Sequence, residues 1–169
     1  MKKKTEVIIT LAIIMIILSI TLMGAEKEGQ THVIIIASGE FEEKAVNRLP
    51  STLKDAEKLK EQIIKMGIAQ EKNIKEYKNP TYAQINVAFL DIGKNLKEED
   101  RIIIYYGGHG FSGKENNNLY IVPKDYQEDY KEETSYNLTK GLEKALRQAK
   151  YKEALIIIDA CHSGGIIEG

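Results

Sequence analysis

Two stretches of consecutive apolar residues constrain the fold of this chain more than any other feature. Residues 102–106 and 154–158 are apolar at every position, without the alternation that marks a half-exposed strand. Runs of this kind are typical of strands in a parallel sheet, which is covered on both faces. They therefore predict an α/β fold with helices on either side of a sheet.

The remaining segments alternate between the strand and helix patterns of apolar residues. Short apolar runs at residues 33–36 and 119–122 predict further strands, and residues 74–77 are expected to form another short strand. Amphipathic stripes, which predict helices, lie at residues 51–66, 81–96 and 138–149. This order predicts a three-layer α/β sandwich with a mainly parallel sheet.

Capping residues and loops refine this expectation. Residues 50–52 are expected to open the first helix, with Asp55 at its third position if Thr52 is the cap, and Thr81 with Gln84 has the spacing of a capping box. Residues 107–118 contain several glycines and asparagines and are expected to form a loop. Residues 125–136 show no periodicity.

The first 25 residues differ from the rest of the chain. A basic start is followed by residues 7–25, which carry no charge. This pattern is typical of a secretory signal peptide or of an uncleaved signal anchor, and both interpretations stay open beside a buried core helix. We expect residues 26–31 to be a linker, residues 32–169 to be the folded domain, and the domain to be extracytoplasmic, either secreted or membrane-anchored.

Composition excludes several classes of protein. A hydrophobic fraction of 43% excludes a disordered chain, and a charged fraction of 29% excludes a multispan membrane protein. A single cysteine excludes an internal disulfide framework and a cysteine-rich zinc site. A net charge of -1 gives no electrostatic reason to expect nucleic acid as a partner.

Polar, glycine-containing sequence follows both of the fully apolar runs. His109 comes shortly after the first run, and Asp159, Cys161 and His162 come after the second. Ligands of α/β sheets bind beyond the carboxyl ends of the strands, where a thiol beside an imidazole acts as a nucleophile. Because consecutive residues of an extended chain point in opposite directions, His109 is the predicted partner of Cys161.

Two other interpretations of the same residues stay open. A lone cysteine is often a buried core residue, and a lone histidine is often a hydrogen-bonded structural group. A metal site would use Cys161, His109, His162 and Asp159, although the wider Cys/His spacing of such sites is missing. We expect no metal in the catalytic chemistry.

These two segments resemble the caspase-like cysteine peptidases, peptidase family C14, in the metacaspase and prokaryotic caspase-homologue branch. That family has a strand ending in Tyr-Ser-Gly-His-Gly, which corresponds to residues 106–110 with glycine at 107. A second strand ends in Asp-Ser/Ala-Cys-His-Ser-Gly, which corresponds to residues 159–164. Weaker similarities lie at residues 49–56, 81–85 and 119–125, so the resemblance runs from about residue 32 to residue 165.

The resemblance implies a cysteine endopeptidase with defined residue roles. Cys161 is the nucleophile, His109 is the general acid and base, and the backbone N–H groups of Gly110 and Cys161 form the oxyanion hole. Asp55 and Asp159 match the two aspartates that line a pocket for arginine or lysine. In the competing interpretation Asp55 only stabilises the start of its helix.

Two further features of the family, its substrate specificity and its use of calcium, correspond less closely to this sequence. Arg48 matches the arginine that binds substrate aspartate in true caspases only after a shift of one residue, so we expect cleavage after basic residues. Many members of the family need calcium as an activator, for which Asp125, Glu128 and Asp129 are the candidate ligands. The chemistry itself requires no cofactor.

The chain ends eight residues after Cys161, whereas the family domain continues with further helices and strands. We therefore expect a C-terminally truncated domain in which strand 154–158 has an uncovered edge that pairs with a partner chain or with a second copy. The expected partners are a protein or peptide substrate and, if the leader is uncleaved, the membrane. The alternative function is an inactive caspase-like scaffold that binds or regulates a partner protein.

Overall fold

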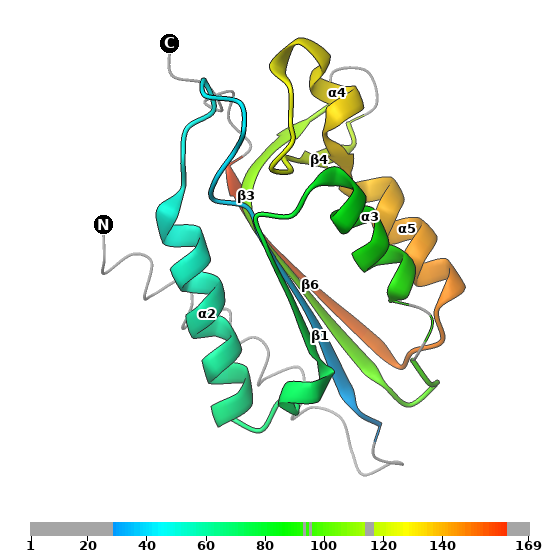
Figure 1. The fold of residues 1–169 in the computed structure, drawn as a ribbon. Coiled ribbons are helices and arrows are strands. Elements are labelled where there is room, and N and C mark those ends of the chain that lie inside the picture. Colours follow the sequence, from blue (N-terminus) through cyan, green and yellow to red (C-terminus); the bar gives the residue numbers. More distant parts are fainter. Residues whose placement is uncertain (1–28, 93, 95, 114–116, 162–169) are drawn as a thin grey trace.

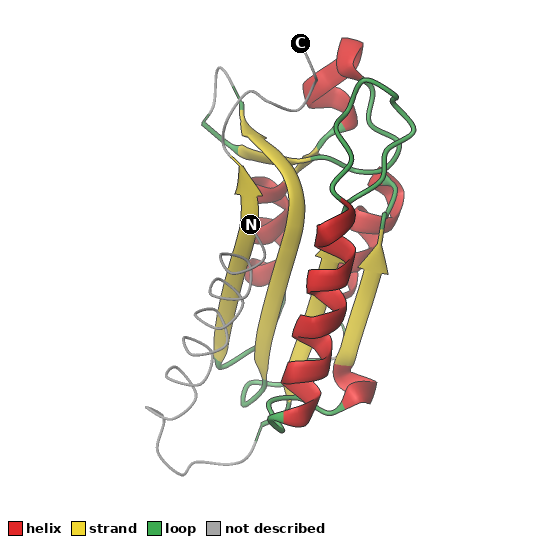
Figure 2. Ribbon diagram, turned by 90° about the vertical axis from the view of Figure 1, so that its left-hand side faces the viewer, coloured by secondary structure: helices red, strands yellow, loops and turns green. Residues whose placement is uncertain are grey.

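The computed structural model describes residues 29–92, 94, 96–113 and 117–161, and for Cys161 it gives the backbone position. Its layers are those predicted from the sequence (Figure 1). Helix α2 (Pro50–Lys65) covers one face of the sheet, whereas α3 (Tyr82–Asp91) and α5 (Leu138–Gln148) cover the other. Figure 2 shows the same layers after a quarter turn. The predicted three-layer α/β fold is confirmed.

Four parallel strands form the main part of the sheet. They are β1 (Thr31–Ala37), β2 (Ile74–Lys78), β3 (Arg101–Ser112) and β6 (Glu153–Cys161), in the spatial order β2-β1-β3-β6. β3 pairs with β1 from Arg101 to Gly107 and with β6 from Arg101 to His109. Because all four strands are parallel, their carboxyl ends meet at one edge of the sheet.

The prediction of a loop from residue 107 onward is wrong, because β3 continues to Ser112. Its far end pairs antiparallel with β4 (Leu119–Ile121), and β4 pairs with β5 (Tyr136–Asn137). Gly108 permits this course, since it adopts a φ of 153°. A Cβ there would lie 2.5 Å from the Tyr106 hydroxyl and 3.0 Å from the Ser38 carbonyl oxygen. The glycines therefore let the strand pass close to its neighbours.

Thr52 does not cap the first helix, so the condition that placed Asp55 at its third position is not met. α2 starts at Pro50, with Leu49 in the capping position and no side-chain cap. Proline is favoured at the first helical position because its φ is already helical and its missing N–H would be unpaired there anyway. Asp55 consequently lies in the second turn of α2, and the first turn contains no acidic residue.

The helix starting after Thr81 has the predicted capping box. The Thr81 hydroxyl accepts from the Gln84 N–H at 3.3 Å, and the Gln84 side-chain oxygen accepts from the Thr81 N–H at 2.9 Å. α3 ends at Asp91, earlier than the apolar stripe predicts. Gly93 follows in the sequence, and glycine is a poor helix former.

The segment without periodicity contains only short elements. They are a 3-10 turn at Glu128–Tyr130, α4 (Lys131–Thr134) and β5. A second 3-10 turn, Glu71–Asn73, precedes β2. No helix in the described ranges is long and apolar enough to cross a membrane. The apolar leader at residues 1–25 lies outside those ranges.

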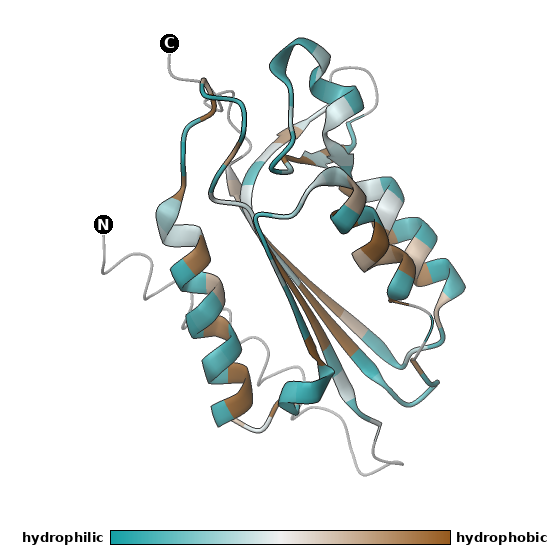
Figure 3. Cartoon of the chain, viewed as in Figure 1, coloured by the Kyte–Doolittle hydropathy of each residue, from teal (hydrophilic) through white to brown (hydrophobic). Residues whose placement is uncertain are grey.

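Three apolar clusters hold these layers together. Figure 3 shows the hydrophobic colour along the central strands of the sheet. The first cluster lies between the sheet and α3 and α5, and includes Ile34, Ile102 and Ile104. The second lies between the sheet and α2 and includes Ile35 and Ile103, as the alternation of side chains along a strand requires. The third lies under the loops beyond the carboxyl ends of the strands and consists of Phe41, Val46, Phe111, Tyr120, Val122 and Tyr126.

Candidate active site

The histidine predicted to be catalytic lies near the far end of β3 and is 7% exposed. Its Nε2 is 2.7 Å from the backbone carbonyl oxygen of Asn47, in the loop between β1 and α2. A carbonyl oxygen can only accept, so Nε2 of His109 carries the proton and donates it. In the neutral imidazole Nδ1 is then the unprotonated nitrogen. The Phe41 ring packs on the imidazole with the ring centroids 5.3 Å apart, which fixes its orientation.

The backbone groups of His109 and Gly110 point to opposite sides of β3. The His109 carbonyl is hydrogen-bonded on the β4 side, and the Gly110 N–H is directed to the other side. The His109 carbonyl oxygen accepts from the Tyr106 hydroxyl at 2.6 Å and from the Val122 N–H at 3.1 Å. The bond from Val122 makes Gly110 and Ile121 a non-hydrogen-bonded antiparallel pair. The Gly110 N–H is therefore directed away from β4, towards the side on which β6 lies.

The single cysteine of the sequence is the last residue of β6. Cys161 is the Cα partner of His109 in the parallel pairing of β6 with β3. Neighbouring strands lie about 4.8 Å apart, so the pairing brings these two positions together at the carboxyl edge of the sheet. His162, the other candidate partner in the sequence, lies outside the described residues.

The two aspartates predicted to bind substrate also come together at this edge. Asp55 is on α2 and is 9% exposed, whereas Asp159 is on β6, where it is the Cα partner of Gly107. Burial raises the pKa of the Asp55 carboxyl above its ordinary value, the charge of Lys58 lowers it in part, and the charge of Asp159 raises it further. The two carboxyl groups are therefore close enough to repel each other electrostatically.

Tyr105 on β3 connects this acidic pair. Burial raises the pKa of its hydroxyl, and the charges of Asp159 and Asp55 and a side-chain hydrogen bond with Asp159 raise it further. The hydroxyl thus remains protonated and donates to Asp159. It also occupies the space above Gly107, where a Cβ would lie 2.8 Å from the Tyr105 hydroxyl oxygen.

The interpretation of Asp55 as a residue that only stabilises its helix start is contradicted by the structure. That role requires a carboxylate in the first turn, and Asp55 lies in the second. Arg48, the residue expected in an acid-specific pocket, is exposed in the loop that contains Asn47.

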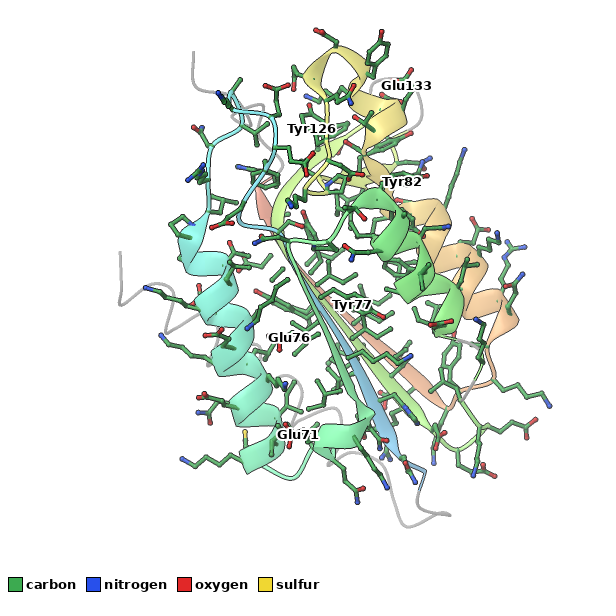
Figure 4. All side chains as sticks on the ribbon, viewed as in Figure 1. Glu71, Glu76, Tyr77, Tyr82, Tyr126 and Glu133 are labelled. Carbon is green, nitrogen blue, oxygen red and sulfur yellow. The ribbon has the colours of Figure 1, made fainter. Side chains whose placement is uncertain are left out.

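Two of the three acidic residues considered for calcium accept hydrogen bonds from other groups. The Asp125 carboxylate accepts from the Tyr82 N–H at 2.7 Å, and the Glu128 carboxylate accepts from the Tyr126 hydroxyl. Figure 4 labels Tyr82 and Tyr126 in this region, above the carboxyl ends of the strands. Within residues 29–92, 94, 96–113 and 117–161, no three His, Cys, Asp or Glu side chains are grouped as a metal site would require. Calcium as an activator stays a prediction.

Sequence reasoning missed three contributors to this site. Asn47 acts through its backbone carbonyl, which every residue has, so no sequence signal identifies it. The Phe41 ring lies far from His109 in sequence and contacts it only through the fold. Tyr105 had a usable signal, because it lies two residues before Gly107 and so on the same face of the strand.

Comparison with known protein families gives one match. The caspase-domain model of peptidase family C14 matches residues 30–169, which include both strand ends described above. A search of curated proteins gave no match.

Proposed function

Because this chain belongs to the caspase-domain family of cysteine peptidases, we propose that it hydrolyses peptide bonds with Cys161 and His109, after arginine or lysine. The observation that carries the proposal is the pairing of β3 with β6. It places the only cysteine and a buried, oriented histidine on neighbouring strands at one edge of the sheet. That edge is where ligands of open α/β sheets bind.

The proposed reaction has two steps. The thiolate of Cys161 attacks the substrate carbonyl carbon, the C–N bond breaks, and a thioester forms while Nδ1 of protonated His109 gives its proton to the leaving amine. Nδ1 then takes a proton from water, whose oxygen attacks the thioester; the C–S bond breaks, the carboxylic acid is released, and the sulfur leaves as the thiolate beside protonated His109. Throughout, Asn47 accepts the hydrogen bond from Nε2 and keeps Nδ1 available.

Negative charge on the substrate oxygen requires donors that are already in place. The Gly110 N–H is directed away from β4, and we assign it this role together with the Cys161 N–H. Removing one oxyanion-hole donor costs on the order of 10²–10³ in kcat in other hydrolases. Glycine at 110 also permits close approach, since a Cβ there would lie 3.2 Å from the Ala160 Cβ.

The acidic pair supports the proposed preference for a basic residue before the cleaved bond. In the absence of substrate, the charge of Asp159 raises the pKa of the Asp55 carboxyl. A guanidinium placed between them would offset that repulsion and donate two parallel hydrogen bonds to a carboxylate. Tyr105, by donating to Asp159, holds one of the two carboxylates in position.

The place of action is part of the same proposal. The lysines at residues 2–4 and the uncharged stretch at residues 7–25 support export of the domain. Immunoblotting of membrane, secreted and cytoplasmic fractions tests this. Recovery of the protein in the cytoplasmic fraction alone would contradict it.

Fluorogenic peptides that differ only in the residue before the reporter test the activity. The proposal predicts turnover of peptides ending in Arg or Lys and much slower turnover of one ending in Asp. Cys161→Ala and His109→Ala should abolish turnover. His32→Ala is the matched control, because His32 lies at the opposite end of the sheet, 3.5 Å from Asp100. Faster cleavage after Asp, or full activity of Cys161→Ala, would overturn the proposal.

A further inference from the structure

Asn79 stands out because it is one of two non-glycine residues in the described part of the chain with a positive φ. Its φ is 48°, directly after the end of β2. Asparagine tolerates this left-handed conformation better than most residues, but the conformation still has to be held by its surroundings. The Asn79 N–H donates to the Ala37 carbonyl oxygen at 2.7 Å, which fixes the backbone.

The side chain of Asn79 reaches the loop between β1 and α2. Its Oδ1 accepts from the Gly39 N–H at 2.9 Å and from the Glu40 N–H at 3.0 Å. Two N–H donors at one atom require an oxygen there, so the orientation of the amide is set by the chemistry. The bonds connect segments that are about 40 residues apart in sequence.

The same loop carries the carbonyl group that orients His109. The Leu49 N–H donates to the Gly39 carbonyl oxygen at 2.9 Å and closes the loop at its base. Asn47 precedes Leu49 by two residues, and its carbonyl oxygen is 2.7 Å from Nε2 of His109. The hydrogen bonds between Asn79 and Gly39 and between Gly39 and Leu49 therefore fix the loop of residues 39–49. This loop positions the Asn47 carbonyl.

The residue after Asn79 connects a second loop to residues 39–49. The Pro80 carbonyl oxygen accepts from the Lys124 N–H at 2.9 Å, and the Lys124 carbonyl oxygen accepts from the Glu42 N–H at 2.9 Å. The loop that follows β4 is thereby bound to the loop that contains Asn47. Phe41, which packs on His109, lies in sequence between Glu40, whose N–H donates to Asn79, and Glu42, whose N–H donates to Lys124. The Phe41 side chain is 8% exposed.

We propose that Asn79 is a positioning residue for His109, acting through its two hydrogen bonds to residues 39 and 40 and through the Asn47 carbonyl. The inference deepens the proposed function, on which the catalytic importance of His109 rests. Asn79 lies on the far side of β1 from β3, and it acts on the reaction only through the loop that it holds.

Three variants separate the hydrogen bonds from the backbone conformation. Asn79→Gly keeps the left-handed φ accessible but removes the acceptor, whereas Asn79→Asp keeps both an acceptor oxygen and tolerance of that φ. Asn117→Gly is the matched control, since Asn117 is exposed and has a φ of 53°. It makes the same substitution in the same conformation away from the Asn47 loop.

Two readouts are made on the full chain. Nitrogen-15 NMR of histidine-labelled protein follows the His109 Nε2–H proton, which exchanges slowly with water while it is bonded to Asn47. Steady-state kinetics with an Arg-ended peptide give kcat and KM separately. We expect Asn79→Gly to lose the protected signal and to lower kcat by about tenfold or more with KM within about twofold, because small misplacements of a catalytic group are costly.

Asn79→Asp should restore both readouts, and Asn117→Gly should match the wild type. Retention of the protected signal in Asn79→Gly would overturn the inference, as would its loss in Asn117→Gly to the same extent. Absence of a protected signal in the wild type would overturn it too. If the wild type cleaves no peptide but Asn79→Gly still loses the signal, the proposed function fails and the positioning role stands.

Discussion

His109 and Cys161 occupy the last register position between the parallel strands β3 and β6. Two positions earlier in the same ladder, Gly107 is paired with Asp159. Because alternate residues of a strand share a face, the spacing of two on each strand groups the predicted nucleophile, base and substrate carboxylate. One strand pairing thus assembles residues from two distant segments of the chain.

Asp55 should contribute to substrate binding at the expense of stability. Burial and the charge of Asp159 raise the pKa of Asp55 above its ordinary value of 3.8, so the ionised carboxylate destabilises the fold at neutral pH. Asp55→Asn should raise Tm by about 2–4 °C, equivalent to about 1 kcal/mol. It should also raise KM for an Arg-ended peptide about tenfold, since a charge-assisted bond is lost.

The raised pKa of Asp55 also predicts how the stability difference between the wild type and Asp55→Asn changes with pH. The native state binds the Asp55 proton more tightly than the unfolded state, so stability falls as pH rises through the interval between the two pKa values. The advantage of Asp55→Asn should therefore shrink as pH falls below that interval. Glu57→Gln on the same helix is the control, because Glu57 pairs with Lys78 at 2.6 Å and should give no stabilisation. A lower Tm for Asp55→Asn would contradict the prediction.

The cost in stability of a side chain at position 107 should depend on the hydroxyl of Tyr105. A Cβ at 107 would lie 2.8 Å from the Tyr105 hydroxyl oxygen and 3.0 Å from Thr52 Cγ2. Gly107→Ser should cost about 1–3 kcal/mol of unfolding free energy in urea titrations, as overpacking does. Adding Tyr105→Phe should recover most of this loss, because it removes the nearest atom. Additivity of the two changes within about 0.5 kcal/mol would show that the residues are not coupled.

Asp100 should make the fold sensitive to acid. Burial alone would raise the pKa of Asp100, but hydrogen bonds from the N–H groups of Lys97 and Gln30, with His32 nearby, bring it below its ordinary value of 3.8. Its contribution is therefore present above that value and is lost as pH falls through the native pKa.

Asp100→Asn should destabilise the protein by about 1–3 kcal/mol at pH 7 and by less as the pH falls below 3.8, measured by chemical unfolding. Asp129→Asn serves as control because Asp129 is exposed. A difference between wild type and Asp100→Asn that stays constant from pH 7 to pH 3 would refute the assignment.

The outer edge of β6 should promote association. Among the described residues β6 pairs with β3 alone, and Ile156 on it is 38% exposed. Unpaired apolar strand edges template pairing with other chains, and a lysine on the edge suppresses it. Ile156→Lys should shift the sedimentation profile at micromolar concentration towards the monomer. Val87→Lys, at a 51% exposed position on α3, should not. A wild type that is monomeric under these conditions would contradict the prediction.

Some of this architecture could be predicted from the sequence because the signal is local. The runs at residues 102–106 and 154–158 are apolar at every position, which is typical of a strand covered on both faces. The Thr81 capping box is likewise encoded within four residues. The segments at residues 106–110 and 159–164 carry the family resemblance that the match over residues 30–169 confirms.

Other features depend on contacts between distant segments. The glycines after Tyr106 have the composition of a loop, yet they extend β3 because β4 pairs with them. The start of α2 lies within one residue of the predicted position, but its cap could not be predicted, because Pro50 begins the helix without a capping side chain. The Asn47 carbonyl contacts His109 across about 60 residues of sequence, and the Asn79 amide contacts Gly39 across about 40. Neither contact has a local sequence pattern that identifies the partner.

The most direct measurement is active-site labelling of the full chain with a peptidyl acyloxymethyl ketone that ends in arginine, followed by intact mass analysis. Since the sequence contains one cysteine, a single thiol adduct identifies Cys161. The account predicts one adduct per chain, formed at least about 100-fold more slowly in His109→Ala, because the thiolate then lacks its imidazole partner. No adduct on a chain that circular dichroism shows to be folded, or equal labelling rates for wild type and His109→Ala, would contradict it.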